Sequence, residues 1–258
     1  MGSPAEPSTT GGFLAGVRLL AQGISMYGRD PKLVVLGIVP ALISGALYLG
    51  AFVTLIMFIG DLAQLATWFA DDWSSGARTT ARVVAAVVIL GLGALLGVLS
   101  FTAVTLLIGD PFYETISERI EERFGGVPDA VEVPWWRSLR RSLVDSGRLL
   151  LVSVGIGVPL FFAGFIPILG QTVIPAIAAT VGGWLLAVEL VGAPFARRGL
   201  RLRDRRAALR AHRPMALGFG VSVFLCFLVP LGAVLVMPAA VAGGTLLARR
   251  VLGLPVAG

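Results

Sequence analysis

The sequence predicts an all-α, polytopic membrane protein with two long transmembrane helices and two half-membrane helical hairpins related by an internal repeat. Hydrophobic residues make up 56% of the chain and charged residues only 14%, and the mean hydropathy is +0.88. This composition excludes a disordered chain and argues against a soluble globular one. Two further observations set the architecture, namely long charge-free stretches and a repeat in the second half.

The two long spans are predicted at 33–60 and 83–109, which are 28 and 27 residues without a charge. As helices they would each be about 40 Å long at 1.5 Å per residue, and the hydrocarbon layer is roughly 30 Å thick. Gly93 and Gly97 have the small-xxx-small spacing that lets two membrane helices pack closely. We therefore expect two full spans that pack against a neighbouring helix.

The repeat relates two apolar stretches, 149–195 and 214–248, at an offset of 63 residues. The matched positions are Gly155, Gly157, Pro167 and Pro175 in the first stretch and Gly218, Gly220, Pro230 and Pro238 in the second. We interpret the four prolines as marking hairpin turns. Repeated apolar segments interrupted by Pro and Gly are typical of membrane permeation sites.

Each repeat copy is expected to fold as a hairpin that enters and leaves the membrane on one side. Folded in two, the second stretch leaves arms of about 23 Å, shorter than the bilayer core. Re-entrant hairpins are thus favoured over four further spans, which remain the alternative. Apex backbone in lipid would leave N–H and C=O groups unsatisfied. We therefore expect a homo-oligomer, a dimer or higher, or a pore.

Flanking charges set the expected topology and boundaries. The loop between the long spans carries several acidic residues, whereas the outer flanks are basic, so the positive-inside rule places both termini in the cytoplasm. Residues 1–11 are expected to be a disordered tail, 12–250 a single domain and 251–258 a C-terminal tail. Within that domain, 12–28 reads as an interfacial amphipathic helix.

Two shorter helices are expected around the cytoplasmic connection. Asp110 and Pro111 suit the N-cap and first position of a separate helix that ends at Gly125-Gly126. Trp135-Trp136 and the arginines after them indicate an interfacial helix that leads into the first hairpin.

The sequence has no cluster of residues that would indicate catalysis or metal binding. Cys226 is the single cysteine and His212 the single histidine, and neither belongs to a cluster of metal-ligand type. A phosphate-binding Gly-Lys-Ser/Thr loop is absent from the sequence. We expect no enzyme, no cofactor and no metal. The arginine run between Arg197 and Arg213 favours contact with anionic lipid headgroups over nucleic acid.

Gly16-Val17-Arg18 is the candidate anion-binding element. A guanidinium beside backbone N–H groups suits a tetrahedral oxyanion, which takes several charge-assisted hydrogen bonds. The alternative is that Arg18 anchors an interfacial helix to headgroups. Glu189, about two turns before Arg197, is either an interface carboxylate or a coupling or gating residue.

Several segments together resemble one family, the CysZ-type sulfate permeases, which are the bacterial branch of the etoposide-induced-protein family. The similar segments are Asp110-Pro-Phe-Tyr-Glu114, Gly192-Ala-Pro-Phe195, Leu217-Gly-Phe-Gly220, Val229-Pro230 and Val236 to Thr245. The resemblance covers about residues 12–250. It departs at Pro230, which is followed by Leu-Gly-Ala where relatives often carry an asparagine.

The resemblance implies a bacterial inner-membrane permease or channel that moves sulfate or a related oxyanion inward to supply sulfur assimilation. In that family a Gly-hydrophobic-Arg element near the first helix is associated with sulfate, which matches Gly16, Val17 and Arg18. The alternative is a non-transporting membrane scaffold or interaction protein of the same fold.

Overall fold

The computed structural model describes residues 9–127, 135–229 and 231–256, which are almost entirely helical. No strand occurs in these ranges, and the predicted all-α class is confirmed. The chain forms two compact units, one of Ile38–Asp110 and one of the residues before and after it. The single domain expected over 12–250 therefore comprises two units, while its boundaries stay predictions.

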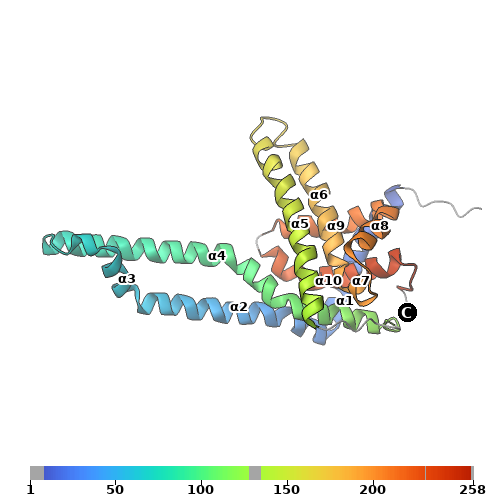
Figure 1. The fold of residues 1–258 in the computed structure, drawn as a ribbon, viewed down its shortest axis with the longest axis horizontal. Helices are drawn as coiled ribbons and strands as arrows, with labels where there is room; N and C mark the ends of the chain where they lie inside the picture. Colours follow the sequence, from blue (N-terminus) through green and yellow to red (C-terminus); the bar gives the residue numbers. More distant parts are fainter. Residues whose placement is uncertain (1–8, 128–134, 230, 257–258) are drawn as a thin grey trace, which may run out of the picture. The chain divides into compact units, whose positions relative to one another are not determined.

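The smaller unit is built from parts of two long helices. These are α2 (Pro31–Met57) and α4 (Ser75–Glu122), both of which continue into the larger unit. The short helix α3 (Ile59–Ala66) and the 3-10 turn η1 (Trp68–Ala70) connect them at one end (Figure 1). The predicted spans lie within α2 and α4, except that α2 ends at Met57, three residues early.

Tyr48 of α2 makes a polar and an aromatic contact with two residues of α4. The Tyr48 hydroxyl lies 2.7 Å from the Ser100 hydroxyl, and its ring meets the ring of Phe101 edge-on at 5.5 Å. A Cβ placed on Gly97 would contact Tyr48 at 3.7 Å, and one on Gly93 would collide with Leu55 at 2.5 Å. The packing role predicted for Gly93 and Gly97 is confirmed.

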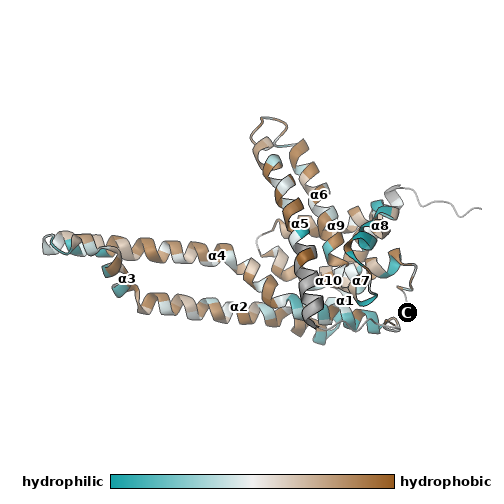
Figure 2. Cartoon of the chain, in the orientation of Figure 1, coloured by the Kyte–Doolittle hydropathy of each residue, from teal (hydrophilic) through white to brown (hydrophobic). Residues whose placement is uncertain are grey.

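Most of the apolar surface of α2 and α4 is uncovered. The most apolar 18-residue window of α4 is 0% buried, and that of α2 is 22% buried. Both helices are largely coloured as hydrophobic in Figure 2. Exposed apolar surface of this extent is rare in soluble monomers and is the expected condition of a helix in lipid.

The larger unit packs six further helices around a core of small residues. These are α1 (Thr9–Arg29), α5 (Trp135–Ala163), α6 (Val173–Leu190), α8 (Leu202–Ala211), α9 (Arg213–Phe227) and α10 (Gly232–Val251), with the short helix α7 (Gly192–Arg197) between α6 and α8. The helix α10 is the centre of this unit, and 83% of its most apolar window is buried.

Glycines set the closest approaches of α1. Gly16 faces the backbone of α9 at Met215, where an added Cβ would collide with the carbonyl oxygen. Gly23 faces α10, where an added Cβ would lie 2.6 Å from the backbone nitrogen of Gly243. Since glycine lacks a Cβ, these helices can approach more closely than ridges of larger side chains allow.

The predicted apolar face of α1 is only partly right. That face was expected to carry Phe13, Val17, Leu20, Ile24 and Tyr27. Leu20 is only 5% exposed, but Phe13 and Ile24 are 38% and 49% exposed. The buried face instead follows the two glycines and includes Leu19, which is 0% exposed. Helix α1 also begins at Thr9, so residues 9–11 belong to it and not to the predicted tail; residues 1–8 lie outside the described ranges.

Two helical hairpins follow the expected order, α5 with α6 and α9 with α10 (Figure 1). The first arm is longer than predicted, because α5 starts at Trp135 and the separate interfacial helix does not exist. The arms α6 and α10 are long and apolar enough to cross a membrane, which corrects the estimate of short arms throughout. The 15-residue α9 spans only about 23 Å.

The prolines are not all in turns, which corrects their predicted role. Pro167 lies in the turn between α5 and α6, but Pro175 and Pro238 lie inside α6 and α10. Pro230 falls outside the described residues. The described non-glycine residues with left-handed backbone are Ile168 (φ 69°) and Leu231 (φ 60°). These two positions are separated by the same offset as the aligned glycines.

The helix after the second span is not separate. Helix α4 runs without interruption through Asp110 and Pro111 to Glu122, whereas an N-cap at Asp110 was expected. A proline in a helix interior removes one backbone hydrogen bond and clashes with the preceding turn, and the boundary of the two units lies at this point. The predicted stop is confirmed, with Gly125 and Gly126 at φ 92° and 72° and the Gly126 N–H donating to the Glu121 carbonyl.

Candidate functional site

The predicted anion-binding element lies in the middle of α1. Gly16 is buried against α9, Val17 is half-buried and Arg18 is exposed. Backbone N–H groups at an interior helical position bond along the helix, so those of Gly16 and Val17 are not directed at a ligand as the sequence suggested. The Arg18 guanidinium is therefore the group of this element that faces outward.

The Arg18 side chain has no acidic partner in the described part of the chain. Among the described residues no carboxylate lies within ion-pair distance of its guanidinium, and its side chain makes no hydrogen bond there. Its planar fork can offer paired donors to an oxyanion. The close contact of Gly16 with Met215 and Phe219 fixes the turn of α1 on which Arg18 sits.

Glu189 lies on another helix, α6, where it is exposed and directly follows buried Ala187 and Val188. Two of the candidate prolines also lie on elements other than α1. Pro167 is exposed in the turn after α5, and Pro175 is exposed in the first turn of α6. Pro238 is buried, and an added Cβ on Gly37 would lie 2.7 Å from its ring. The structure thus assigns Pro238 a packing position.

A buried charged cluster was missed by the sequence analysis. Glu121 of α4 is 1% exposed and receives a bidentate interaction from Arg198, at 2.6 Å and 2.9 Å. The Arg249 guanidinium of α10 binds the same carboxylate. We call Glu121, Arg198 and Arg249 the Glu121 cluster. Bidentate pairs between arginine and carboxylate are among the stronger hydrogen-bonded contacts.

Both arginines of the cluster also donate to backbone carbonyls. Arg249 donates from Nε to the Pro255 carbonyl and from Nη2 to the Phe124 carbonyl, both at 2.9 Å, and its guanidinium lies 5.2 Å from the Phe124 ring. Arg198 donates to the Pro194 carbonyl at 2.8 Å. These contacts hold α10 and the C-cap residue of α7 to the last turn of α4.

A sequence signal for the cluster existed but pointed elsewhere. The apolar stripe expected after Pro111 ran through Phe112, Ile116, Ile120 and Phe124, and the burial of Ile116 and Ile120 confirms part of it. The buried face also takes in Tyr113, Ser117 and Glu121, whereas the acidic residues were expected on the outer face. Ser117 accepts a hydrogen bond from the Thr245 hydroxyl of α10 at 2.8 Å. A glutamate one turn after a buried serine was the available clue.

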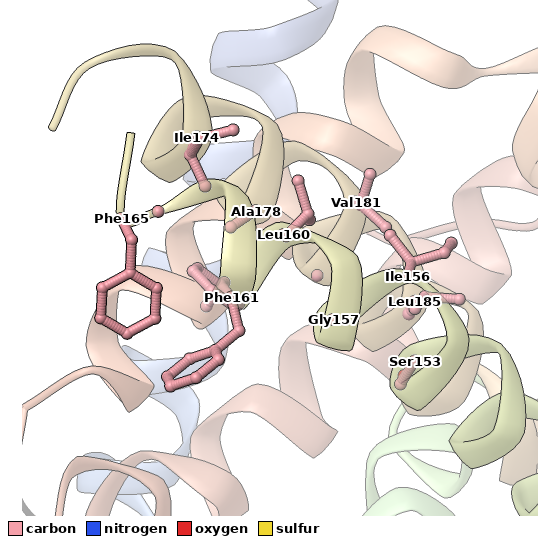
Figure 3. A pocket seen from close by; sticks show the side chains of 13 residues that line it. Ser153, Ile156, Gly157, Leu160, Phe161, Phe165, Ile174, Ala178, Val181 and Leu185 are labelled. Atoms are coloured by element: carbon pink, nitrogen blue, oxygen red, sulfur yellow. The ribbon is translucent and has the colours of Figure 1, made fainter. Parts of the chain in front are cut away.

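A cavity of about 610 Å³ lies along the first hairpin, between α5 and α6 and beside Phe224 of α9. Figure 3 shows Leu160, Phe161 and Ile174 among the side chains around it. Among the described residues that line it, Ser153 supplies the polar side chain. Moving a charged oxyanion into apolar surroundings without partners is strongly unfavourable. This cavity suits apolar groups and not an inorganic anion.

Comparison with known proteins identifies the family. The family model described as sulfate transporter CysZ/etoposide-induced protein 2.4 matches residues 19–238. The chain is 33% identical over 154 residues to the sulfate transporter CysZ of Pseudomonas fluorescens strain Pf-5, covering 57% of this chain and 60% of that protein. It is 31% identical over 147 residues to that of Vibrio parahaemolyticus, covering 56% and 60%.

A third relative, the sulfate transporter CysZ of Pectobacterium atrosepticum, is 29% identical over 147 residues, covering 56% of this chain and 54% of the relative. The chain thus spans about 54–60% of the length of these relatives. Four described helices are long and apolar enough to cross a membrane. The chain is a multi-pass bacterial membrane protein and belongs to the sulfate transporter CysZ/etoposide-induced protein 2.4 family.

Proposed function

We propose that this protein is an inner-membrane permease or channel for sulfate or a related oxyanion, and that it moves the anion inward for sulfur assimilation and cysteine synthesis. The observation that carries this proposal is the family match, which extends from α1 into α10. The relatives of known name are called sulfate transporters. A transport role without catalysis also agrees with the residue types in the chain.

Purified protein in proteoliposomes tests the transport function. Radiolabelled sulfate should enter these vesicles faster than it enters empty liposomes of the same lipid. The measurement should be repeated under several pH gradients, because the coupling ion is part of the question. Sulfate entry no faster than in empty liposomes under every gradient would contradict the proposal and favour a non-transporting scaffold.

Within this function, Arg18 is the proposed anion-binding residue. Its side chain is exposed and has no carboxylate partner among the described residues. In this proposal Gly16 and Val17 do not bind the anion directly. They help to hold Arg18 in place, since Gly16 packs α1 closely against α9. The loss of one charged hydrogen bond is worth about 1.5–3 kcal/mol, which corresponds to roughly ten- to hundredfold weaker binding.

Calorimetry in detergent tests this assignment with a matched control. Arg18→Ala should weaken sulfate binding by roughly ten- to hundredfold, while Arg29→Ala, at the exposed end of the same helix, should change it less. Both variants should keep the wild-type elution volume. Equal sulfate affinity in wild type and Arg18→Ala would assign this arginine to headgroup anchoring instead.

Glu189 is the proposed coupling or gating residue. A carboxylate on a membrane helix can exchange a proton and so link anion movement to pH. Glu189→Gln should then flatten the pH dependence of sulfate flux while leaving sulfate affinity near its wild-type value. A pH profile of flux identical to that of the wild type would remove Glu189 from the mechanism.

The proposed topology has both termini in the cytoplasm and both hairpins re-entrant from that side. Their turns carry exposed apolar side chains, including Ile168, Leu169 and Leu231, which favour lipid or protein over outer water. In a Cys226→Ala background, Leu169→Cys and Leu231→Cys should resist an impermeant thiol reagent added from outside. Rapid labelling at both positions would show that the hairpins cross the membrane.

We also expect a homo-oligomer, a dimer or higher. The support is the uncovered apolar side of the first hairpin, where Phe161, Phe162 and Phe165 are at least 65% exposed. Light scattering in mild detergent should give a mass that is a multiple of 27.0 kDa. A monomer mass across several detergents would contradict this part of the proposal.

A further inference from the structure

The outer face of α8 is a stripe of arginines. Arg203, Arg206 and Arg210 follow the spacing of one helical face, and Arg203 and Arg210 are exposed while Arg206 is half-buried. The opposite face, with Leu202, Arg205 and Leu209, is buried in the larger unit. The helix therefore separates a packed face from a basic one, and it is coloured mainly as hydrophilic in Figure 2.

This basic face borders a pocket rather than a flat surface. A cavity of about 630 Å³ is lined by these three arginines together with Arg148 of α5, and by the aliphatic side chains of Leu151, Val152 and Leu202. Arg148 stands where the apolar part of α5 begins, at Gly147–Ala163. The pocket thus combines a basic wall on α8 with a mainly apolar wall on α5 that starts at Arg148. We call it the α5–α8 pocket.

Among the described residues, little negative charge balances the arginines of the pocket. Asp204 lies 3.5 Å from the Arg203 guanidinium and also accepts a hydrogen bond from the Arg201 N–H at 2.8 Å. In the described part of the chain, Arg148, Arg206 and Arg210 have no ion pair or side-chain hydrogen bond. Like charges gathered around one hollow repel each other, so an anion placed among them would be stabilised.

The apolar wall indicates what kind of anion fits. Leu151 is 74% exposed and Val152 is 40% exposed, and they continue toward further exposed apolar residues along α5. A free sulfate ion is wholly polar and would leave this wall uncovered. A phospholipid has a phosphate that arginine pairs bind bidentately and acyl chains that cover apolar side chains. Basic pockets at the ends of membrane helices are known to bind such headgroups.

We infer that the α5–α8 pocket binds the phosphate of an anionic phospholipid, with Arg206 and Arg210 contacting the headgroup and Leu151 and Val152 contacting an acyl chain. The shared chemistry is a tetrahedral oxyanion held by guanidinium groups. This site is separate from Arg18, and the inference stands whether or not the protein conducts sulfate.

Native mass spectrometry of the full chain, titrated with phosphatidylglycerol or phosphatidylcholine, tests the inference. The wild type should retain phosphatidylglycerol in preference to phosphatidylcholine. The double variant Arg206→Gln/Arg210→Gln should bind phosphatidylglycerol about tenfold more weakly or worse. A control, Arg29→Gln/Arg250→Gln, removes the same charge from exposed positions outside the pocket and should bind as the wild type does.

Two further measurements make the result decisive. Arg148→Gln changes the other wall of the pocket and should reproduce the loss, which provides an independent variant if the double variant fails to fold. Calorimetry with sodium sulfate distinguishes the two sources of oxyanion. If the pocket variants lose sulfate binding and keep phosphatidylglycerol binding, the pocket holds a free anion and the lipid assignment is wrong. Equal phosphatidylglycerol binding in wild type, pocket variants and control would also overturn it.

Discussion

The two helical hairpins have similar sequences and opposite surroundings. In the second hairpin, Gly218 and Gly220 of α9 pack directly on backbone, and an added Cβ would collide with the carbonyl oxygens of Phe13 and Gly183. The aligned glycines of the first hairpin, Gly155 and Gly157 of α5, have nothing within 4 Å of an added Cβ. The same residue type is a packing requirement in one hairpin and open space in the other.

The difference extends along the whole arms. The most apolar window of α10 is 83% buried, and that of α6 is 22% buried. Helix α10 is covered by α1, α9 and the last turns of α4, whereas α5 packs mainly on α6. Positions that align in sequence therefore have different neighbours in the two hairpins. The second hairpin forms the core, and the first is the one with surface left for lipid or a partner.

The sharpest test of this contrast compares Gly220→Leu with Gly157→Leu. Gly220→Leu places a side chain where α6 backbone lies, and we expect a destabilisation of about 5 kcal/mol or more, comparable with the stability of a whole domain. Gly157→Leu should leave the folded yield near that of the wild type. The measurement is the fraction of protein that elutes as a single species in detergent.

The expected effect of Gly220→Leu is on folding of the single chain, because the partner of Gly220 is Gly183 of the same chain. If Gly220→Leu elutes with the wild-type profile and melts at the wild-type temperature, the contact between α6 and α9 is not essential. Equal damage from both leucine variants would erase the distinction between the hairpins.

A second test concerns the end of α10. Arg249→Ala removes one partner of a buried charge pair and leaves the carboxylate of Glu121 with Arg198 alone, so we expect a loss of about 3–5 kcal/mol. Arg250→Ala, at the exposed neighbouring position, should change stability by less than about 0.5 kcal/mol. Thermal unfolding of both variants in the same detergent provides the comparison.

Similar melting temperatures for Arg249→Ala and Arg250→Ala would show that the Glu121 cluster contributes little to the core. As a second check, Arg198→Ala acts on the same carboxylate from α7. It should be destabilising in the same direction, because Glu121 is almost fully buried.

The smallest expected effect is at the turns. Ile168 and Leu231 hold left-handed backbone at φ 69° and 60°, which costs an L-residue roughly 1–2 kcal/mol. Because Ile168 is 77% exposed, Ile168→Gly should lose little packing and should raise stability by about 0.5–1 kcal/mol after the entropic cost of glycine. Leu231→Gly should gain less, since Leu231 is less exposed. A fall in melting temperature for Ile168→Gly would indicate that its side chain is packed by a partner.

Local signals in the sequence were sufficient for several features. The charge-free stretches predicted α2 and the apolar part of α4, the spacing of Gly93 and Gly97 predicted a helix contact, and Gly125-Gly126 predicted the end of α4. Each of these depends on residues close together in the chain or on lipid as the solvent. The candidate site could not be predicted in the same way. Free N–H groups at Gly16 and Val17 required a helix that begins there, but both residues lie in the interior of α1.

Features that depend on distant partners were mispredicted. The buried face of α1 follows Gly16 and Gly23 because α9 and α10 approach there, and hydrophobicity along α1 alone favoured Phe13 and Ile24. The burial of Glu121 depends on Arg198 and Arg249, which are remote in sequence. From sequence alone a charged residue is predicted to be exposed, because burying an unpaired charge is strongly unfavourable.

The glycine contacts of α1 have a consequence for biosynthesis. Helix α1 leaves the ribosome well before its partners, because Gly218 and Gly243 are made about 200 residues later. At typical elongation rates of about 5–20 residues per second, α1 waits for roughly 10–40 s. During that time its apolar side chains and glycine backbone have no native partner. Early chaperone or insertase contact should therefore protect α1, and premature termination before α9 should leave a fragment that is degraded.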